Sequence, residues 1–465
     1  MARIFGQYLS LRKVIFIFGE GLLIYAAVSL AAYFFMGGAV TFSGLLGAFW
    51  MKILLVSMIT QMSLYFNDLY EIKHTGNMVD LATRLIQSVG IASIVLAVVY
   101  FLWPEAIIGR WIFFLSIVFL LLFLVSWRFL YTLVITKRLF ADKAIMIGSG
   151  ELAGDIMAEV QQRSDIGYDI RVILGHEKDK NGSSRFEDVP VHYGFNELCK
   201  IAETEQASHI IVAMDEKRGI MPYKQLLACK VKGMSVIDGE SFYERITGKI
   251  LVEKINPSWL IFSDGFKKSK VKRIVKRVTG LMLAVLMICL VSPLILLVAL
   301  AIKLDSRGPV FFSQERVGEN GKVFVLYKFR SMRADAEKES GPVWAEKEDI
   351  RTTRVGRIIR KLRIDELPQL WNVLKGDMSF VGPRPERPFF VETLSKKIPY
   401  YDERFTVKPG VTGWAQIKYP YGASEKDALE KLKYDLFYIK HLSIPMDLMV
   451  IFQTVKIVLL GRGSR

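Results

Sequence analysis

Two adjacent carboxylates, Asp365 and Glu366, are the residues of this 465-residue chain best placed to do chemistry. Pro368 is tolerated only in a first helical turn, apolar residues follow at helical spacing, and Gly376 is suited to end a helix. The pattern predicts a short helix with both carboxylates at its N-terminus, where free N–H groups attract phosphate. One carboxylate could face a phosphorus atom while the other holds a metal ion, because adjacent helical residues project in different directions. The simpler alternative is a helix cap followed by a solvated glutamate.

Basic residues lie on both sides of this pair. The segment 327–332 (YKFRSM) alternates apolar and polar residues as a strand edge does, which predicts Lys328 and Arg330 on one face. Five cations lead into the pair and two prolyl-flanked arginines follow it: Arg354, Arg357, Arg360, Lys361, Arg363, Arg384 and Arg387. Any one of them alone would be a solvated surface group. Together, rigid arginines beside two carboxylates are suited to hold a diphosphate and a divalent cation, which predicts a phosphoryl-transfer site.

The composition is that of a membrane protein, since 52% of the residues are hydrophobic. Apolar segments near the twenty residues needed to span hydrocarbon cover 14–36, 45–66, 85–103 and 111–135, which predicts a four-helix transmembrane domain over 1–140. Lysine and arginine precede the first segment, separate the second from the third and follow the fourth, so the N-terminus and everything after residue 136 are expected in the cytoplasm. No cleavage site follows the first segment, which is read as an anchor. The segments contain almost no ionisable residues, which favours anchoring or assembly over transport.

Residues 141–266 have the pattern of a Rossmann-like α/β domain. An apolar strand at 144–147 leads into a glycine turn at 148–154 (GSGELAG), and further strands are predicted at 170–174, 209–213 and 235–237, with helices at 195–204 and 223–231. No acidic residue clearly closes the second strand, so recognition or regulation is favoured over dinucleotide binding and NAD is not expected. The three cysteines, Cys199, Cys229 and Cys289, are widely spaced, which indicates a reducing compartment or no disulfide role.

A basic run, Lys267 to Arg277, precedes an uncharged segment over 281–302 that is long enough to cross a bilayer. A crossing would export a strongly basic domain, against the positive-inside rule. Ser292 and Pro293 lie at its midpoint, where proline removes a helical hydrogen bond and the serine hydroxyl can satisfy a freed carbonyl. We therefore predict a re-entrant helix over about 273–303 that breaks at Ser292-Pro293, with a full span as the alternative. The basic run is expected on anionic lipid headgroups.

From about residue 271 to the end, the chain resembles the bacterial sugar transferases, which are monotopic polyprenyl-phosphate phosphoglycosyl transferases. The resemblance rests on the basic approach to a Ser-Pro-broken helix and on the strings KFRSM, DELPQ, GDMSFVGPRP, KPGVTGW and the stretch from Tyr434-Asp435 to Asp447. With four preceding spans and a Rossmann-like insert, the whole chain resembles the large form of exopolysaccharide and O-antigen initiating enzymes. This implies a mainly α-helical, α+β catalytic domain over 267–465, on the cytoplasmic face of a bacterial inner membrane.

The resemblance also implies a reaction. A sugar 1-phosphate would pass from a nucleotide diphosphate sugar, with uridine as the base in this family, to polyprenyl (undecaprenyl) phosphate. Asp365 would attack the phosphorus to form an aspartyl phosphate, and Glu366 would bind Mg²⁺, with Mn²⁺ as a substitute. The implied substrate-binding residues surround the pair: Lys328, Arg330, Arg360, Arg384 and, as a supporting residue only, Asp377.

Other readings find less support. A nucleotide-sugar dehydratase or epimerase would need a Tyr-x-x-x-Lys pair, a metal-dependent glycosyltransferase would need Asp-x-Asp, and the chain contains neither. A silent scaffold for polysaccharide assembly would not need the intact Asp365-Glu366 pair. The net charge of +16 suits lipid and phosphate, and no nucleic-acid-binding module is visible, so no nucleic-acid partner is expected. The strings concern phosphate, so they leave the sugar open. A homodimer through the membrane and middle domains is our hypothesis for why these domains exist.

Overall fold

The computed structural model describes residues 2–4, 7–9, 11–35, 42–70, 78–136, 141–163, 166–176, 186, 189–254, 265–266, 269–333, 351–419, 422 and 424–460. The chain forms two compact units, of which the first comprises Met1–Ala2 and Tyr8–Phe242 and the second comprises Arg3–Gln7 and Tyr243–Arg465. Each unit is described separately below.

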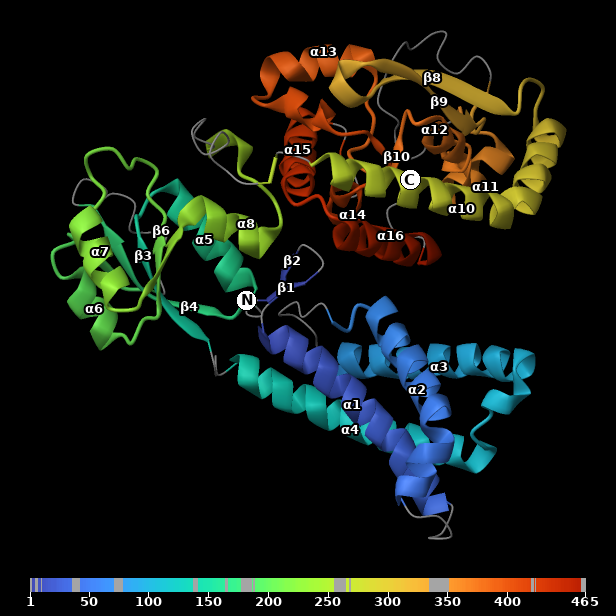
Figure 1. Cartoon of the computed structure of the whole chain (residues 1–465), viewed down its shortest axis with the longest axis horizontal. Helices are drawn as coiled ribbons and strands as arrows, with labels where there is room; N and C mark the ends of the chain where they lie inside the picture. The colour runs from blue at the N-terminus through green and yellow to red at the C-terminus, as the bar shows by residue number, and fades with distance from the viewer. Residues whose placement is uncertain are drawn as a thin grey trace. The chain divides into compact units, whose positions relative to one another are not determined.

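Four long apolar helices begin the first unit, as predicted. After two short strands, β1 (Ala2–Ile4) and β2 (Gln7–Leu9), come α1 (Leu11–Phe35), α2 (Phe42–Phe66), α3 (Met78–Leu102) and α4 (Arg110–Thr136), with the short turn η1 (Pro104–Ala106) before α4 (Figure 1). All four are long and apolar enough to cross a membrane. Helix α1 packs against α4 and α2, and α2 packs against α3.

One polar contact inside this helical domain was not anticipated. Arg128 of α4 donates to Glu20 of α1 over 2.7 Å and to the carbonyl of Leu69 over 2.8 Å, and both charged side chains are buried. This pair is the exception to the expectation of almost no buried ionisable groups among the described residues of these helices. A buried charge is tolerated only when it is paired and hydrogen-bonded, and here the pair joins the first helix to the fourth.

The α/β domain has the predicted doubly wound architecture. Its parallel sheet has the order β5-β4-β3-β6-β7, which places β3 at the centre. The elements are β3 (Asp142–Ile147), α5 (Glu151–Gln162), β4 (Tyr168–Gly175), β5 (Val191–Tyr193), α6 (Leu198–Thr204), β6 (His209–Val212), α7 (Tyr223–Val231), β7 (Ser235–Asp238) and α8 (Gly239–Thr247). Helix α5 covers one face of the sheet, and α6 and α7 cover the other (Figure 1). Buried aliphatic residues of the central strands form the core, since a parallel sheet is covered on both faces.

The expectation that the cysteines have no disulfide role is wrong for two of them. Cys199 of α6 is bonded to Cys229 of α7, with their Cα atoms 5.5 Å apart. The two residues are 30 positions apart in the sequence, and the sequence pattern did not show that α6 and α7 lie side by side on the sheet. Cys289 is a free, exposed thiol.

The second unit is mainly helical around two small β-pairs, as the resemblance implied. Its elements are η4 (Val252–Lys254), α10 (Lys270–Asp305), β8 (Phe311–Val317), η5 (Glu319–Gly321), β9 (Val323–Phe329), α11 (Arg354–Lys361), η6 (Ile364–Glu366), α12 (Gln369–Lys375), β10 (Ser379–Val381), α13 (Pro388–Lys397), η7 (Tyr401–Thr406), β11 (Gly410–Thr412), α14 (Trp414–Lys418), α15 (Glu425–Lys440) and α16 (Ile444–Leu459). Strands β8 and β9 form an antiparallel hairpin, and β10 pairs in parallel with β11. The main core lies where α15 and α16 meet Trp414 and Tyr401.

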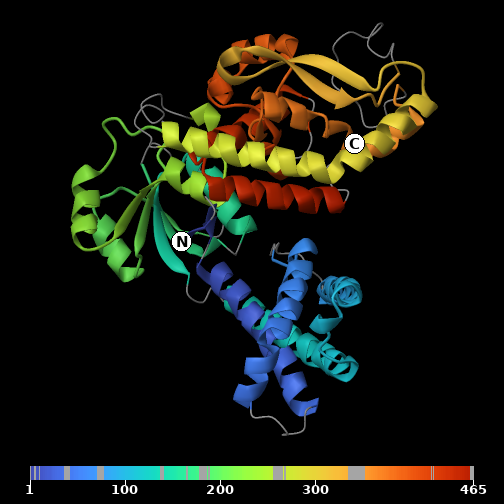
Figure 2. The same ribbon diagram turned by 45° about the vertical axis from the view of Figure 1, so that its right-hand side comes forward.

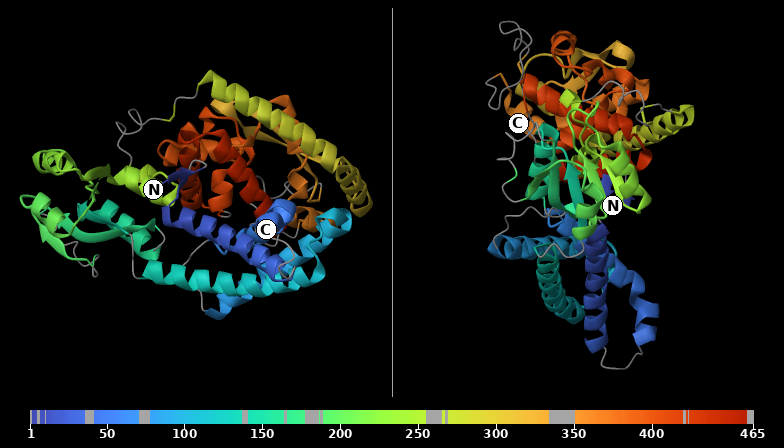
Figure 3. Two further views of the ribbon diagram at one scale, coloured as in Figure 1. Left: turned by 60° about the horizontal axis from the view of Figure 1, so that its bottom comes forward. Right: turned by 90° about the vertical axis from the view of Figure 1, so that its left-hand side faces the viewer.

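Helix α10 is one continuous, bent helix of 36 residues that contains Pro293 (Figure 2). The hydroxyl of Ser292 donates to the carbonyl of Cys289 over 3.0 Å. Pro293 has no N–H, so this carbonyl would otherwise lose its helical partner. The predicted role of the serine is thereby confirmed. The helix bends but continues past Pro293 as one helix instead of breaking there. Figure 3 shows α10 lying along the side of the other helices of its unit.

Two cations of the basic run bond to groups of their own unit. Lys276 donates to the carboxylate of Asp447 over 2.6 Å and to the hydroxyl of Tyr438, and Arg277 donates to the carbonyls of Val373 and Leu374. The prediction that the whole run rests on lipid headgroups is therefore wrong for these two residues. Lys270, Lys272 and Arg273 are exposed, while Lys267 and Lys268 lie outside the described residues. The helical period explains the division, because it turns part of any run of seven cations inward.

Candidate active site

The carboxylate pair lies in a turn of its own. Asp365 and Glu366 belong to the 3₁₀ turn η6, which follows Arg363 in the left-handed conformation (φ 55°), and α12 begins only after Pro368. Gly376 ends α12 with φ 96°, as the sequence indicated. The prediction of a short helix is thus confirmed, but the pair precedes that helix instead of opening it. With only seven residues, α12 contributes little dipole, so the positive charge around the pair must come from side chains.

Helix α12 is fixed by bonds at its middle and at its C-terminal end. Asn372 donates to the carbonyl of Val325 over 2.7 Å and accepts from the amide of Tyr327 over 3.1 Å, which ties the helix to strand β9. The carbonyls at its C-terminal end accept bonds from Arg277 and from Lys408, the latter over 2.6 Å at Gly376. These bonds set the distance between η6 and the strand that carries Lys328.

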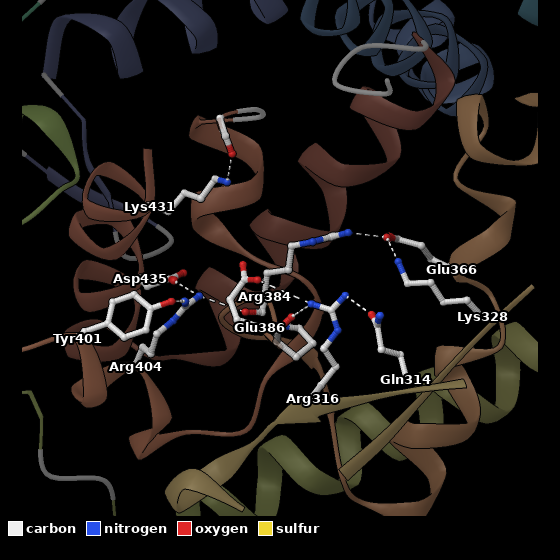
Figure 4. A network of polar contacts seen from close by, with 12 residues as sticks. Gln314, Arg316, Lys328, Glu366, Arg384, Glu386, Tyr401, Arg404, Lys431 and Asp435 are labelled. Atoms are coloured by element: carbon white, nitrogen blue, oxygen red, sulfur yellow. Dashed lines mark hydrogen bonds and ion pairs between the residues drawn. The ribbon is translucent and has the colours of Figure 1, made fainter. Parts of the chain in front are cut away.

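Glu366 lies within a cage of cations (Figure 4). Its Oε1 atom accepts from Lys328 over 3.0 Å and from Arg384 over 2.8 Å, and its Oε2 atom lies 3.7 Å from Arg363. Burial by itself would raise the pKa of Glu366, but the positive charges outweigh burial and hold the pKa below its usual range. Glu366 is therefore a permanently ionised carboxylate.

Asp365 is equally buried but behaves differently. Burial raises the pKa of Asp365 to about 6, and the neighbouring negative charge of Glu366 also raises it. Lys328, Arg360 and Arg384 act in the opposite direction without overcoming burial. Two carboxylates side by side thus have opposite shifts, a common sign of a functional site in which each group has its own task.

Three of the predicted substrate-binding residues gather at the pair. Lys328 and Arg384 contact Glu366 directly, and Arg360 lies close enough for its charge to lower the pKa of Asp365. Arg360 also donates to the hydroxyl of Thr352 over 3.2 Å. The Arg384 side chain keeps 40% of its surface exposed, so a substrate can reach it.

The structure places the other two elsewhere. Arg330 is buried and donates to the carbonyls of Ser306 and Arg307 over 2.8 and 3.1 Å, at the C-terminal end of α10. Strand β9 ends at Phe329, so the alternation that would put Arg330 on the face of Lys328 no longer holds there. Asp377 contacts Asn372 at 3.5 Å and has no described contact with the pair.

A second polar network, missed by the sequence analysis, supports Arg384 from behind (Figure 4). Arg404 is buried, donates to the carboxylate of Asp435 over 2.9 Å and to the hydroxyl of Tyr401, and also donates to the backbone carbonyl of Arg384 over 3.0 Å. Arg316 of β8 donates to the carbonyl of Pro385 over 3.0 Å. Asp435 belongs to one of the strings that the sequence singled out. Arg316 and Arg404 had no such signal, because each acts through a backbone carbonyl far away in the sequence.

The carboxylates fit Mg²⁺ only as part of a shared site. Among the described residues, no group of three or more His, Cys, Asp or Glu side chains could hold a metal by itself. Mg²⁺ usually takes one or two carboxylates, the phosphates of a substrate and water, and the always-ionised Glu366 beside Asp365 meets that requirement. The residues therefore fit a metal that arrives together with a diphosphate.

The apolar helices, the α/β sheet and this charged pair among arginines define a multidomain membrane-bound transferase. The bacterial sugar transferase family matches residues 271–461, which include the whole site, and the CoA-binding domain family matches residues 65–220. The chain belongs to the bacterial sugar transferase family.

Three relatives illustrate the similarity. The UDP-N-acetylgalactosamine-undecaprenyl-phosphate N-acetylgalactosaminephosphotransferase of Aeromonas hydrophila is 42% identical over 240 residues, which cover 52% of this chain and 56% of that protein. The undecaprenyl-phosphate glucose phosphotransferase of Komagataeibacter xylinus is 34% identical over 373 residues, 78% of this chain and 68% of that one. The UDP-glucose:undecaprenyl-phosphate glucose-1-phosphate transferase of Escherichia coli (strain K12) is 44% identical over 191 residues, 40% of each chain.

Proposed function

We propose that this protein transfers a sugar 1-phosphate from a UDP-sugar to undecaprenyl phosphate and thereby starts the synthesis of a polysaccharide or glycoconjugate. The observation that carries the proposal is the pair of adjacent buried carboxylates with opposite pKa shifts, enclosed by Lys328, Arg360 and Arg384. The names of the relatives support it, because all three act on undecaprenyl phosphate as sugar phosphotransferases. They differ in the sugar, so the donor of this chain stays open.

The carboxylate of Asp365 is the nucleophile in this proposal. One of its oxygens attacks the sugar-linked phosphorus, and the bond from that phosphorus to the bridging oxygen of the diphosphate breaks. Nucleoside monophosphate leaves, and the sugar phosphate remains on Asp365 as an acyl phosphate. An oxygen of undecaprenyl phosphate then attacks the same phosphorus, the acyl phosphate bond breaks, and the products are undecaprenyl diphosphate sugar and free Asp365. Lys328, Arg360 and Arg384 offset the charge that develops on the phosphate oxygens.

Glu366 is proposed as the protein ligand of Mg²⁺. A bound Mg²⁺ neutralises charge on the diphosphate and polarises it toward attack. Lys328 and Arg384 now occupy Oε1 of Glu366, so both side chains are expected to move onto substrate phosphate when donor and metal bind. Lys328 and Arg384 therefore keep Glu366 ionised until they bind the substrate phosphate instead.

We place the site at the cytoplasmic surface of the inner membrane, with α10 as a re-entrant helix. Both halves of α10 are fixed to the same unit: Arg277 bonds to α12 in the first half, and Val298 and Ile302 pack on Phe329 and Ile359 in the second. A helix that crossed the membrane would carry its second half to the opposite side from α12. Exposed leucines such as Leu290, Leu296 and Leu300 lie on the helix surface away from the unit and suit the acyl region.

Release of nucleoside monophosphate tests the proposal directly. Purified protein in lipid nanodiscs is mixed with a panel of UDP-sugars, with and without undecaprenyl phosphate, and the monophosphate is quantified on a rapid timescale. We expect one donor to give a burst of about one equivalent per active site without lipid, and steady turnover with it. Asp365→Asn is expected to abolish both, and Asp377→Asn, which is outside the pair, to keep the burst. A normal burst from Asp365→Asn would exclude Asp365 as the nucleophile.

A further inference from the structure

The α/β domain has the turn at which proteins of this fold bind a pyrophosphate. Strand β3 leads through Gly148 (φ +111°) into helix α5, at the point where the strand order reverses between β3 and β6. In nucleotide-binding proteins of this fold, the free amides at the start of the corresponding helix bind the phosphates. The match to the CoA-binding domain family over residues 65–220 suggests the same use here.

In this chain those amides already have an anionic partner. The amide of Glu151 donates to Oδ2 of Asp215 over 2.8 Å, and the amide of Leu152 donates to Oδ1 over 3.1 Å. Asp215 comes from the loop that follows β6, the neighbour of β3 across the reversal point. Both oxygens of one carboxylate therefore lie where two oxygens of a phosphate would lie.

The absence of a side chain at Gly150 of the turn leaves room for the carboxylate of Asp215. A Cβ atom added at Gly150 would lie 2.0 Å from Oδ2 of Asp215, well inside any allowed contact. A glycine at this place normally lets a pyrophosphate approach the backbone. Here the carboxylate has taken that space, and its negative charge would repel a second anion at contact distance.

Among the described residues, the end of the second strand supplies no carboxylate. Dinucleotide-binding domains hold a ribose hydroxyl with an acidic residue near this position. Strand β4 ends at Gly175, and the described residues continue from there only to His176. The observation that argues against a bound pyrophosphate is therefore the carboxylate of Asp215 at the amides of α5.

We propose that Asp215 takes the place of a cofactor phosphate at the first amides of α5 and thereby prevents CoA, NAD and other pyrophosphates from binding there. The domain keeps the architecture of a nucleotide-binding fold, with its phosphate position permanently filled by the protein itself. The match to the CoA-binding family then reflects shared fold and ancestry of the sheet, and any ligand of this domain binds elsewhere or lacks a pyrophosphate. The inference concerns the first unit only and is independent of the transfer reaction proposed above.

Hydrogen exchange of the full-length protein in nanodiscs tests the proposal at the site itself. The readout is the amide exchange of the peptide that covers residues 148–156, measured with and without CoA, NAD or inorganic pyrophosphate at millimolar concentration. This readout is local, so phosphate binding at the arginines of the second unit does not disturb it. In the wild-type protein we expect no change with any of the three probes, and protection by CoA or NAD would overturn the proposal.

Two variants test the role of the carboxylate. Asp215→Ala should free the two amides, which then exchange about tenfold faster, and inorganic pyrophosphate should slow them again. Unchanged exchange in Asp215→Ala would show that the carboxylate does not hold the amides and would overturn the proposal. If Asp215→Ala loses protection throughout residues 142–238, Asp215→Asn decides instead, because it keeps the shape and removes the charge. Its two amides are expected to exchange faster than those of the wild type, and equal exchange would contradict the proposal.

Discussion

At the scale of single residues, the main finding is that Asp365 and Glu366 differ although they are neighbours and equally buried. Glu366 accepts bonds from Lys328 and Arg384, so its pKa lies below the usual range, whereas burial raises the pKa of Asp365 to about 6. Among the described residues, the direct cation contacts go to Glu366 only. Asp365 has no such contact there, which suits the role of nucleophile that we propose for it.

The pKa of Asp365 predicts how the first step depends on pH. In the proposed mechanism the attacking species is the carboxylate of Asp365, whose fraction falls about tenfold per pH unit below a pKa of about 6. The burst rate of monophosphate release should therefore be constant at higher pH and decline as the pH falls through this value. Rapid-quench measurements between about pH 5 and pH 8 under subsaturating donor check this. A burst rate that stays constant down to pH 5 would contradict the raised pKa.

Lys328 and Arg330 form a matched pair for mutation, because they are two positions apart and carry the same charge. Lys328→Met removes a cation that contacts Glu366, so we expect kcat/KM to fall about a hundredfold with little change in thermal stability. Arg330→Met leaves the carbonyls of Ser306 and Arg307 without their donor, so we expect a Tm lower by about 2–4 °C. Its donor KM should stay close to that of the wild type. Steady-state kinetics and differential scanning fluorimetry separate the two effects, and a selective loss of donor binding in Arg330→Met would put Arg330 back in the site.

At the scale of elements, helix α10 holds parts of the site in place from both of its halves. Its first half holds α12 through Arg277, and its second half packs on the hairpin and α11 through Val298 and Ile302. Pro293 lies between these two attachments, and Ser292 satisfies the carbonyl that the proline leaves free. The bend thus lets one helix follow the surface of its unit on both sides of the proline.

Replacing the proline should uncouple these two attachments. Pro293→Leu restores a helical N–H and favours a straighter α10, so both halves can no longer meet the unit at once, and we expect activity to fall about tenfold or more. The neighbouring Leu294→Ile is the control and should retain activity. Cytoplasmic accessibility of a tag after the last residue shows whether the variant helix now crosses the membrane. An active Pro293→Leu with unchanged tag accessibility would contradict a positioning role for the bend.

At the scale of the whole molecule, the chain joins a helical membrane domain, an α/β domain and a transferase unit. The buried Arg128 and Glu20 pair fixes the ends of the membrane domain to each other, and the Cys199 and Cys229 disulfide joins two helices of the α/β domain. Both are bonds within a domain, and the contact of Asp215 with the amides of α5 likewise joins two elements of the α/β domain. The homodimer through these domains stays a prediction.

Much of this organisation was readable in the sequence because it depends on local patterns. Runs of apolar residues predict α1 to α4, since their length must match the hydrocarbon, and the alternation of strands and helices predicts the doubly wound sheet. The short string around Asp365 and Glu366 and the arginines beside it predict the site, since a turn, a proline and a glycine act over a few residues. Pro293 with Ser292 is read in the same way, because the freed carbonyl is only four residues away.

Only the tertiary structure decided which partner each charged group contacts. Lys328 contacts Glu366, and Arg330 contacts the C-terminal end of α10. Arg277 contacts the carbonyls of α12, and Asp215 contacts the amides of α5. Each of these contacts joins segments at least 20 residues apart, so it depends on how whole elements pack and not on a local period. The sequence by itself thus determined that a carboxylate pair lies among cations in a chain with several apolar helices. The packed fold determined which cations contact Glu366 and which bond to backbone carbonyls elsewhere. It also determined that Asp215 occupies the amides at the start of α5.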